Sequence, residues 1–515
     1  MGKMAYHTVL DDIALYLLGS AALVIFYRSF FYPYFLSGRR LAPGPTKGEL
    51  SKELKQFNNE INVHFLRHMV KEYGPIFRLV GAPMIPGPGL VVCTPTAQQR
   101  ILVSNSINYG QPRLAFFRWV TGGLFTLPER EHRGMRKILD PVFSFRNLIS
   151  TTGVYYNTVQ SLITIFRSKI DGENGAKDGD VILVYEWLAR LAIDNVSEAI
   201  LGFKLDTLHD PNNELITTLD ELSRIPTAAF ELLVRVPGFL RLVTFDSVRH
   251  STLWQRRVPG RLGVFFTFMR CLSTIRKNAL AIKATILQED SANRDLNVIS
   301  VLQHMQSSDE TANADIAGNI IMLWMSGRAT IATRISWLLW LLAKDQQCQQ
   351  QLRDEIAPLF SRDPRPDYRS LDKLQWLDSV IMESIRLFLF GPNIRVALND
   401  DYIDGVFVPK GTVVVIPLDL FTRGDIWGED PDQFKPARWL DSTKRYKISP
   451  PFLSFLTGPH RCIAKGMAIM QTKIVIASLI ANFEFKPAYE GQHVEGNPSI
   501  IGHGMPLHVK PIRPS

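Results

Sequence analysis

Apolar residues recur with helical spacing along most of this sequence. Four long segments carry an apolar face and few helix-breaking residues: 184–201, 316–343, 371–388 and 466–483. Apolar positions three and four residues apart are typical of helices that bury one side. The pattern therefore predicts a mainly α protein.

Strand patterns are short and local by comparison. In YIDGVFVPKGTVVVIP, residues 402–417, apolar runs are separated by Asp404-Gly405 and by Pro409-Lys410-Gly411. Such residues mark turns between strands, so we expect small β-sheets beside the helices. A chain of 515 residues could hold about three domains of roughly 150 residues, but residues 49–515 contain no internal repeat or low-complexity linker. One large domain is the simpler prediction.

Two segments are apolar enough to enter a membrane. Residues 13–27 carry no charge, and beyond Arg28 the apolar run continues to Leu36. A spanning helix needs roughly 20 apolar residues, so residues 13–36 are predicted to form a transmembrane helix that tilts or lets Arg28 snorkel. The other segment, residues 316–343, contains Arg328 and Arg334, which favour a long helix buried in a soluble core.

The charges around the first apolar segment bear on its orientation. A cleaved secretory signal peptide is the rival interpretation, but basic residues follow the run before any acid appears: Arg28, Arg39, Arg40 and Lys47. A basic flank stays in the cytosol. We therefore expect a lumenal N-terminus at 1–12, a signal anchor at 13–36 and a basic Pro-Gly hinge at 37–48.

Composition and charge narrow the class of protein. Hydrophobic residues make up 46% and charged residues 21% of the chain, as in globular proteins and unlike disordered ones. The net charge is +9, but Lys and Arg are interspersed with acids. This argues against a nucleic-acid partner and suits a protein that meets anionic lipid or an acidic protein.

The four cysteines lie far apart and show no metal-ligand spacing; they are Cys93, Cys271, Cys348 and Cys462. A disulfide framework and a zinc site are therefore not expected. So few thiols in a long chain fit a reducing compartment, where a cysteine is by default a small buried hydrophobe.

The strongest motif lies near the C-terminus, in FLTGPHRCIAKGMA. Phe455, Gly458 and Cys462 match Phe-x-x-Gly-x-x-x-Cys, and the sequence here resembles the cytochrome P-450 family. The resemblance implies that Cys462 is the axial ligand of haem b iron. A thiolate ligand favours cleavage of the oxygen–oxygen bond, and backbone N–H groups and the start of the following helix can stabilise it. His460 and Ala464 depart from the family's usual Arg and Gly.

A second motif is Glu383-Ser-Ile-Arg386, which resembles the family's Glu-x-x-Arg helix. Side chains three residues apart share one helical face. Downstream, FKPARW places Arg438 where the resemblance implies the third member of a buried Glu-Arg-Arg cluster. Its role is structural, to fix the haem-binding loop.

A third motif, EHRGMRKILDPVF, is similar to the family's helix whose Trp-x-x-x-Arg pair binds haem propionate. His132 replaces the Trp and Arg136 matches the Arg. The resemblance implies that Arg395 and His460 also serve the anionic propionates, which need cations or hydrogen-bond donors. Without the resemblance, His132 is equally well explained as an exposed polar helix residue.

The fourth motif is WMSGRATIAT, which resembles the family's oxygen-binding stretch. Gly327 and Thr330 match, but Ala329 replaces the usual acid and Ile331 the second Thr. A glycine permits close approach of a ligand, and a hydroxyl can relay protons. The alternative for Thr330 is a mid-helix threonine that bonds back to its own helix.

The resemblance covers nearly everything from about residue 43 onward. It implies a mainly α cytochrome P-450 fold with small β-sheets, preceded by one transmembrane helix, and a haem-thiolate monooxygenase that inserts one oxygen atom from O2 into a lipophilic small molecule. The sequence has no Gly-x-Gly-x-x-Gly or phosphate loop, so electrons from NADPH are expected through a separate NADPH-cytochrome P-450 reductase, with cytochrome b5 as a second candidate partner. Within the family the sequence resembles the microsomal class. We therefore expect it in the endoplasmic reticulum membrane, with the catalytic domain in the cytosol.

The same resemblance suggests a substrate pocket lined by Phe116, Phe117, Trp324, Met325, Ile394 and Ile500. Residues 230–243 resemble the membrane-facing region over a substrate channel, although a buried helix is the alternative. The haem loop and the terminal GMPLHVKPI resemble those of filamentous-fungal enzymes of secondary metabolism, which suggests a terpenoid or polyketide intermediate. Two other functions stay open: a haem-thiolate isomerase or dehydratase without oxygen activation, and a haem-based sensor or carrier.

Overall fold

The computed structural model describes most of the chain from residue 42 to residue 512. The described segments are 42–56, 62–80, 88–111, 121–171, 179–210, 212–225, 258–288, 296–307, 315–389, 391–440, 453–492 and 504–512, with residues 19, 20, 23, 27, 254 and 256. Within these segments no helix combines the length and the apolar character needed to cross a bilayer. The predicted anchor at 13–36 falls almost wholly outside them, and residues 230–243 entirely, so both stay predictions.

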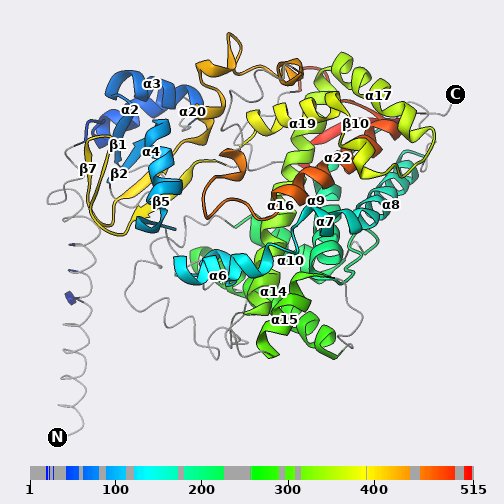
Figure 1. The fold of residues 1–515 in the computed structure, drawn as a ribbon, viewed down its shortest axis with the longest axis horizontal. Coiled ribbons are helices and arrows are strands. Elements are labelled where there is room, and N and C mark those ends of the chain that lie inside the picture. The colour runs from blue at the N-terminus through cyan, green and yellow to red at the C-terminus, as the bar shows by residue number, and fades with distance from the viewer. Residues whose placement is uncertain are drawn as a thin grey trace, which may run out of the picture. The chain divides into compact units, whose positions relative to one another are not determined.

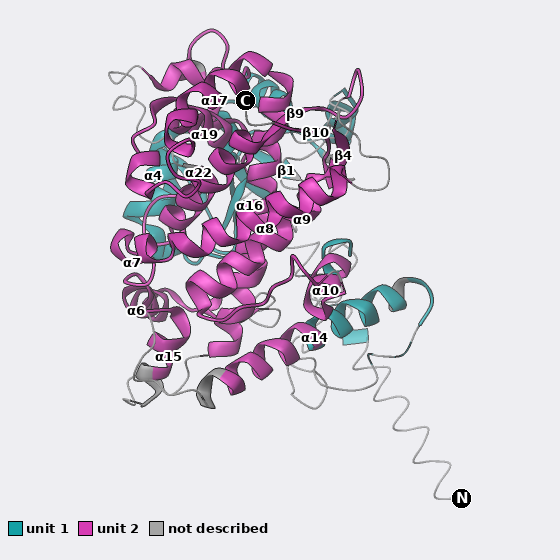
Figure 2. Ribbon diagram, turned by 90° about the vertical axis from the view of Figure 1, so that its right-hand side faces the viewer, with its two compact units in different colours: residues 1–120, 222–273, 392–420 teal, residues 121–221, 274–391, 421–515 magenta. Residues whose placement is uncertain are grey.

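The chain divides into two compact units (Figure 2). Unit 1 consists of residues 1–120, 222–273 and 392–420, and unit 2 of residues 121–221, 274–391 and 421–515. Helix α14, Gly260–Gln288, carries the chain from unit 1 to unit 2.

Unit 1 is built on a five-stranded mixed sheet in the order β1-β2-β8-β5-β3; β1, β2 and β5 are labelled in Figure 1. Its strands are β1 Ile76–Val80, β2 Pro88–Val92, β8 Val413–Ile416, β5 Asn393–Ala397 and β3 Tyr109–Gly110. Strand β2 runs parallel to β8, with Leu90 beside Val414, and the other neighbouring pairs are antiparallel. Helices α2 Lys47–Gln56, α3 Val63–Tyr73 and α4 Pro95–Gln99 also belong to this unit. Apolar side chains of α2 and α3 and of the sheet form its core.

The predicted strands of residues 402–417 are confirmed. Strands β6 Asp401–Ile403 and β7 Val406–Val408 pair as a hairpin, and β8 follows. The turn residues Asp404 and Gly405 have φ angles of 45° and 83°. Positive φ at both central residues is the geometry that Asp-Gly favours in a tight hairpin.

Unit 2 is mainly helical. Its helices include α6 Glu129–Leu139, α7 Phe145–Ser150, α8 Thr152–Ile170, α9 Val184–Val196, α15 Val298–Ser307, α16 Ile316–Lys344, α17 Gln346–Phe360, α18 Tyr368–Leu371, α19 Gln375–Leu387, α22 Lys465–Asn482 and all but the last two residues of α10 Glu214–Ser223. A three-stranded antiparallel sheet has the order β4-β10-β9, with β4 Asp180–Leu183, β10 Pro506–Pro511 and β9 Phe483–Pro487. Helix α20, Leu418–Thr422, spans the boundary between the units.

All four predicted helices are present. The first is α9, continued by a π-helical turn over Ser197–Leu201, and the others are α16, α19 and α22. The mainly α prediction with small β-sheets is therefore confirmed for the described residues.

Helix α16 is the buried core helix that the sequence predicted, and it lies beside α9 (Figure 2). Asp315 caps its start by accepting a hydrogen bond from the Gly318 N–H at 2.8 Å. Gly327 has a packing reason to be glycine, because a Cβ there would lie 2.6 Å from Cγ2 of Val196 in α9. Both arginines within α16, Arg328 and Arg334, are buried.

Candidate active site

The loop that carries Cys462 lies between the 3-10 turn Leu453–Phe455 and the start of α22. The Cys462 N–H donates to the Phe455 carbonyl at 2.7 Å, which closes the loop on itself. Leu456 and Gly458 have left-handed φ angles of 58° and 74°. For Leu456 this conformation costs on the order of 1–3 kcal/mol, so the surrounding structure must hold the loop in place.

The Cys462 residue is exposed, yet protein atoms crowd its sulfur. The resulting desolvation raises the pKa of the thiol, while the Ala464 N–H and three cations, Arg136, Arg334 and Lys465, counteract the rise. The environment differs at Cys93 and Cys348, where burial raises the pKa to about 12. Among these three cysteines, only Cys462 combines access with donors and cations that favour the thiolate.

Glu383 and Arg386 of α19 form the closed pair that their spacing predicted. Both are fully buried, and the Arg386 Nε and Nη2 donate to the two Glu383 carboxylate oxygens at 2.9 and 2.8 Å. Arg438 Nε donates to Glu383 Oε1 at 2.8 Å. Two further donors reach the carboxylate, the Lys435 N–H at 2.9 Å and the Trp439 Nε1 at 2.8 Å.

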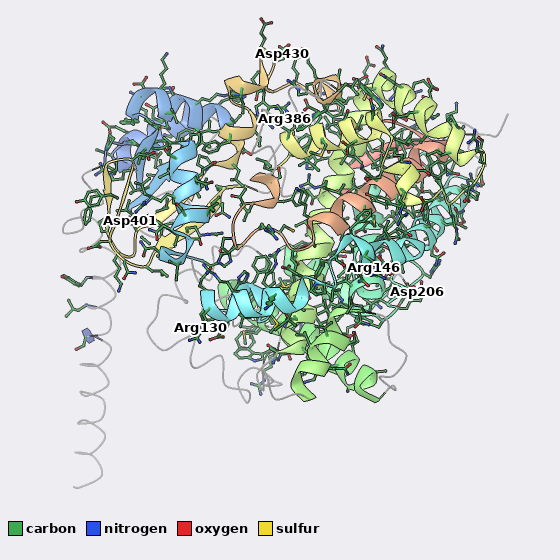
Figure 3. The ribbon with its side chains drawn as sticks, in the orientation of Figure 1. Arg130, Arg146, Asp206, Arg386, Asp401 and Asp430 are labelled. Atoms are coloured by element: carbon green, nitrogen blue, oxygen red, sulfur yellow. The ribbon has the colours of Figure 1, made fainter. Side chains whose placement is uncertain are left out.

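The two arginines also hold backbone carbonyls. Arg386 Nη1 donates to the Thr422 carbonyl at 2.8 Å, and Arg438 Nη1 donates to the Trp427 carbonyl at 2.7 Å. Figure 3 labels Arg386 below the segment that carries Asp430, whose carbonyl accepts from Arg438 Nη2 at 3.0 Å. Ser454 Oγ donates to the Ile385 carbonyl at 3.0 Å, so the segment leading into the Cys462 loop is fastened to α19 directly.

Helix α6 contacts the same loop through a pair of histidines, His132 on the helix and His460 on the loop. The rings of His132 and His460 stack with their centroids 4.2 Å apart. His460 Nε2 lies 2.6 Å from Glu129 Oε2, and Arg133 Nε lies 2.8 Å from Glu129 Oε1. Burial raises the pKa of the Glu129 carboxyl, but the hydrogen bonds from Arg133 and His460 outweigh this effect and the pKa is lowered.

His132 is buried, and within the described part of the chain its Nδ1 has no hydrogen-bond partner. Burial and, next, the neighbouring His460 lower the pKa of His132 to about 4, so its ring is neutral near pH 7. Arg136, one turn further along α6, donates from Nη1 to the Arg461 carbonyl at 2.5 Å and from Nε to Asp140 Oδ1 at 2.8 Å. The loop is thus held by α6 as well as by α19.

Helix α16 is accessible at the predicted oxygen-binding stretch. Within residues 325–330 all side chains except Arg328 keep partial exposure, whereas the residues on both sides are buried. Thr330 Oγ1 donates to the Ser326 carbonyl at 2.6 Å, as in the helix-bonded alternative. Arg328 pairs with Asp220 of α10. One turn after Thr330, the Arg334 guanidinium lies 5.3 Å from the ring centroid of Phe455, in the 3-10 turn that leads into the Cys462 loop.

Comparison with known proteins decides the family. A family model described as Cytochrome P450 matches residues 42–507. The chain belongs to the cytochrome P450 family. Its described fold, mainly helices with small sheets, is consistent with that membership.

Relatives of this cytochrome P450 include fungal and mammalian proteins. Cytochrome P450 monooxygenase sphH of Aspergillus fumigatus is 25% identical over 510 residues, which cover 93% of this chain and 89% of the relative. Cytochrome P450 monooxygenase FUM15 of Gibberella moniliformis is 26% identical over 486 residues, covering 82% and 79%. Cytochrome P450 3A29 of Sus scrofa is 25% identical over 492 residues, covering 92% and 91%. The chain is thus an oxidoreductase of the cytochrome P450 class.

The residues of this cytochrome P450 fit a haem group. Cys462 is an exposed residue whose thiol has an N–H donor and cations around it, and the buried Nδ1 of His132 lacks a partner among the described residues. A buried polar atom without a partner carries a free-energy cost unless something bonds to it. A bound haem would give each of these atoms a partner: its iron would bind the Cys462 sulfur, and a propionate beside α6 would bond to the His132 Nδ1.

Of the remaining predicted site residues, the structure describes Arg395, Ile394, Trp324 and Met325 but not the others. Arg395 and Ile394 lie on β5 in unit 1, where Arg395 Nη1 donates to Gln111 Oε1 at 3.1 Å. Trp324 is fully buried and donates to Ser197 Oγ at 3.0 Å, whereas Met325 is partly exposed. Phe116, Phe117 and Ile500 lie outside the described residues. Their roles stay predictions.

Three contributors were not found from the sequence: Glu129, Arg334 and Trp439. Trp439 directly follows Arg438, and Arg334 is a charge within an apolar helix, so both carried a local signal. Glu129 carried none, because its partner His460 is 331 residues away in the chain.

Proposed function

We propose that this cytochrome P450 is a haem-thiolate monooxygenase that inserts one oxygen atom from O2 into a lipophilic small molecule. The observation that carries the proposal is the accessible Cys462 in a loop fixed from both α19 and α6. Cys462 would ligate the iron, and His132, Arg136 and His460 would contact the propionates. The bound haem supplies the activation of O2.

The chain's own residues prepare this chemistry. The Ala464 N–H and the neighbouring cations stabilise negative charge on the Cys462 sulfur. The Thr330 hydroxyl donates its hydrogen bond to the Ser326 carbonyl. Its oxygen can still accept a hydrogen bond from a donor on the accessible side of α16. Thr330 is thus the proposed catalytic hydroxyl, with Gly327 keeping α16 against α9.

A difference spectrum of the reduced, carbon monoxide-bound protein tests the ligand. Cys462→Ser should abolish the red-shifted thiolate band, whereas Cys93→Ser and Cys348→Ser should retain it. The proposal fails if Cys462→Ser keeps the band and either control loses it.

The electron donor is proposed to be a separate NADPH-cytochrome P-450 reductase, with cytochrome b5 as a second donor. Helix α6 exposes Arg130 and Lys137, and α7 exposes Arg146; Figure 3 labels both arginines. A basic surface attracts an acidic partner and makes the association rate fall with ionic strength. Stopped-flow reduction by the reductase should slow in Arg130→Gln and Lys137→Gln at low salt, and the difference from wild type should shrink at high salt.

A haem-thiolate isomerase or dehydratase is the second candidate. It is favoured by Ala329 in the place of the usual acid and by the donation of the Thr330 hydroxyl to its own helix. Product analysis under isotopically labelled O2 separates the two. Label in the product supports the monooxygenase, and an unlabelled isomer or dehydrated product formed without NADPH supports the alternative.

We also propose an endoplasmic reticulum location, with residues 13–36 as anchor and the catalytic part in the cytosol. The support is the uncharged run and the basic residues after it. Deleting residues 1–38 should release part of the protein from membranes, and unchanged carbonate-resistant retention would contradict the anchor.

The substrate is proposed to be a terpenoid or polyketide intermediate of secondary metabolism. Support comes from the similarity to monooxygenases of Aspergillus fumigatus and Gibberella moniliformis. Expression beside neighbouring biosynthetic enzymes, followed by product identification, tests this class.

A further inference from the structure

A cavity of about 310 Å³ lies in unit 2 outside the Cys462 site. Helix α8, the turn after α17 and the end of α22 form its walls. These helices pack side by side, and α8, α17 and α22 can be followed in Figure 2. Ser478 in its wall lies 13 residues after Lys465, or about 20 Å along α22 at roughly 1.5 Å per residue. The cavity is therefore remote from the residues that would hold haem.

One part of the cavity wall is apolar. It consists of Val159 and Ile163 from α8, Phe360 from α17 and Ala481 from α22. The volume lies at the lower end of the range for small-molecule sites, and apolar walls are what such sites usually present to a ligand. A compact apolar body fits this part.

Two guanidinium groups also line the cavity, Arg167 and Arg365. Arg167 Nη2 donates to Asn482 Oδ1 at 2.7 Å, and Arg365 Nη1 donates to Asn157 Oδ1 at 2.8 Å. Each arginine is thus held by a neutral amide, and in the part of the chain described neither forms an ion pair with a carboxylate. Both retain further N–H donors for an anion, because a guanidinium has five.

Ser478 supplies an independent observation. It lines the cavity and is 3% exposed, and its Oγ has no hydrogen-bond partner among the described residues. A buried hydroxyl without a partner is unfavourable, so a polar ligand atom that reached it from the cavity would be stabilised.

Nearby negative groups limit the charge that the cavity can accept. Asp363 and Asp367 lie close enough to contribute, after burial, to a raised pKa of Tyr156 in the cavity wall. Helices α8 and α22 both end near the cavity, so their negative dipole ends face it. These terms favour a single negative charge over a doubly charged phosphate.

We infer that this cavity is a second binding site, for a small amphipathic carboxylate whose apolar body lies against Val159, Ile163 and Phe360 and whose carboxylate pairs with Arg167 and Arg365. The haem-thiolate site plays no part in this assignment. It does not depend on the proposed function.

The test titrates the full-length haem-loaded protein with decanoate and follows heat by calorimetry and the haem absorption band in parallel. A binding event that leaves the haem band unchanged should weaken at least tenfold in Arg167→Gln/Arg365→Gln and measurably in Ser478→Ala. Arg362→Gln, an exposed arginine of the same turn that does not line the cavity, should bind as wild type. Ala481→Phe, which fills the cavity, should abolish binding. Its melting temperature should be no lower than that of the Arg362→Gln control.

Several results would overturn the assignment. Decanol binding as tightly as decanoate would make the arginines irrelevant, and inorganic phosphate binding as tightly would make the apolar wall irrelevant. Decanoate binding that always shifts the haem band, or that survives both the double arginine variant and Ala481→Phe, would place it elsewhere. None of these results bears on whether Cys462 ligates iron, which the carbon monoxide spectrum decides separately.

Discussion

The Cys462 loop is held from two sides that are built differently. On the support side, the Glu383 carboxylate accepts four hydrogen bonds from Arg386, Arg438 and Trp439 and a fifth from the Lys435 N–H, which makes a closed set. The cofactor side comprises His132, Arg136, His460 and residues 325–330 of α16. There the buried His132 Nδ1 lacks a partner within the described part of the chain, and residues 325–330 other than Arg328 keep partial exposure. The first arrangement is complete within the chain, and the second is suited to receive something from outside it.

The difference teaches where each side acts. A closed buried ion cluster contributes to a single loop conformation, because removal of one member leaves charges without partners. An incomplete polar surface adds little to folding and is available for binding. Substitutions on the support side should therefore reduce stability and haem content together, whereas those on the cofactor side should separate the two.

The largest effect is expected for Glu383→Ala. Loss of the carboxylate leaves Arg386 buried without its partner, which typically costs about 3–5 kcal/mol. Urea unfolding and haem content should both fall steeply. Glu484→Gln, which removes a half-buried partner of the exposed Lys486, should cost about 0–1 kcal/mol. Normal haem content and stability in Glu383→Ala would contradict the structural role.

Gly327→Ala should have the next largest effect. The new Cβ would overlap Val196 at the contact between α16 and α9, and overpacking typically costs about 1–3 kcal/mol. Val196→Ala in the same protein should restore most of the stability. Gly134→Ala at an exposed position of α6, where nothing lies within 4 Å of an added Cβ, should stabilise by up to about 1 kcal/mol. Equal effects at the two glycines would refute the packing role of Gly327.

A smaller effect is expected from the low pKa of His132. Burial lowers this pKa to about 4, so between about pH 6.5 and pH 4 the unfolded chain binds more protons than the folded chain. The contribution of the neutral His132 ring to the free energy of unfolding is at its maximum above about pH 6.5, and it is lost as the pH falls toward 4. In haem-free protein, the urea midpoint should fall less between pH 7 and pH 5 in His132→Phe than in wild type.

The same His132→Phe variant sharpens the comparison at constant pH. Removal of a buried nitrogen that has no partner among the described residues should leave the haem-free protein at least as stable at pH 7.5. The haem should nevertheless transfer faster to an acceptor apoprotein. Slower or unchanged haem transfer, or loss of stability comparable to that of Glu383→Ala, would place His132 on the support side.

The smallest effect on stability is expected for Thr330→Ala. Among the described residues its hydroxyl donates to the Ser326 carbonyl alone, so the free energy of unfolding should change by about 0–1 kcal/mol. If Thr330 relays protons, product per NADPH should fall and peroxide release should rise, while Ala329→Asp should raise product per NADPH. Full product yield in Thr330→Ala would favour the oxygen-independent isomerase.

Local spacing determined much of this protein from the sequence alone. The periodicity of apolar residues gave the helices α9, α16, α19 and α22, because burying one face of a helix needs that spacing. Glu383 and Arg386 were paired correctly because residues three apart share a helical face. The hairpin turn at Asp404-Gly405 followed from the φ angles these residues tolerate.

Tertiary structure alone decided the rest. The contacts of Glu129 with His460 and of Arg334 with Phe455 join residues 331 and 121 positions apart, so no local pattern contains them. Likewise, the sequence suggested ligand approach as the reason for Gly327, and only the packing of α16 on α9 revealed Val196 against it. Short-range spacing determines which side chains share a face, but which faces meet depends on how the whole chain packs.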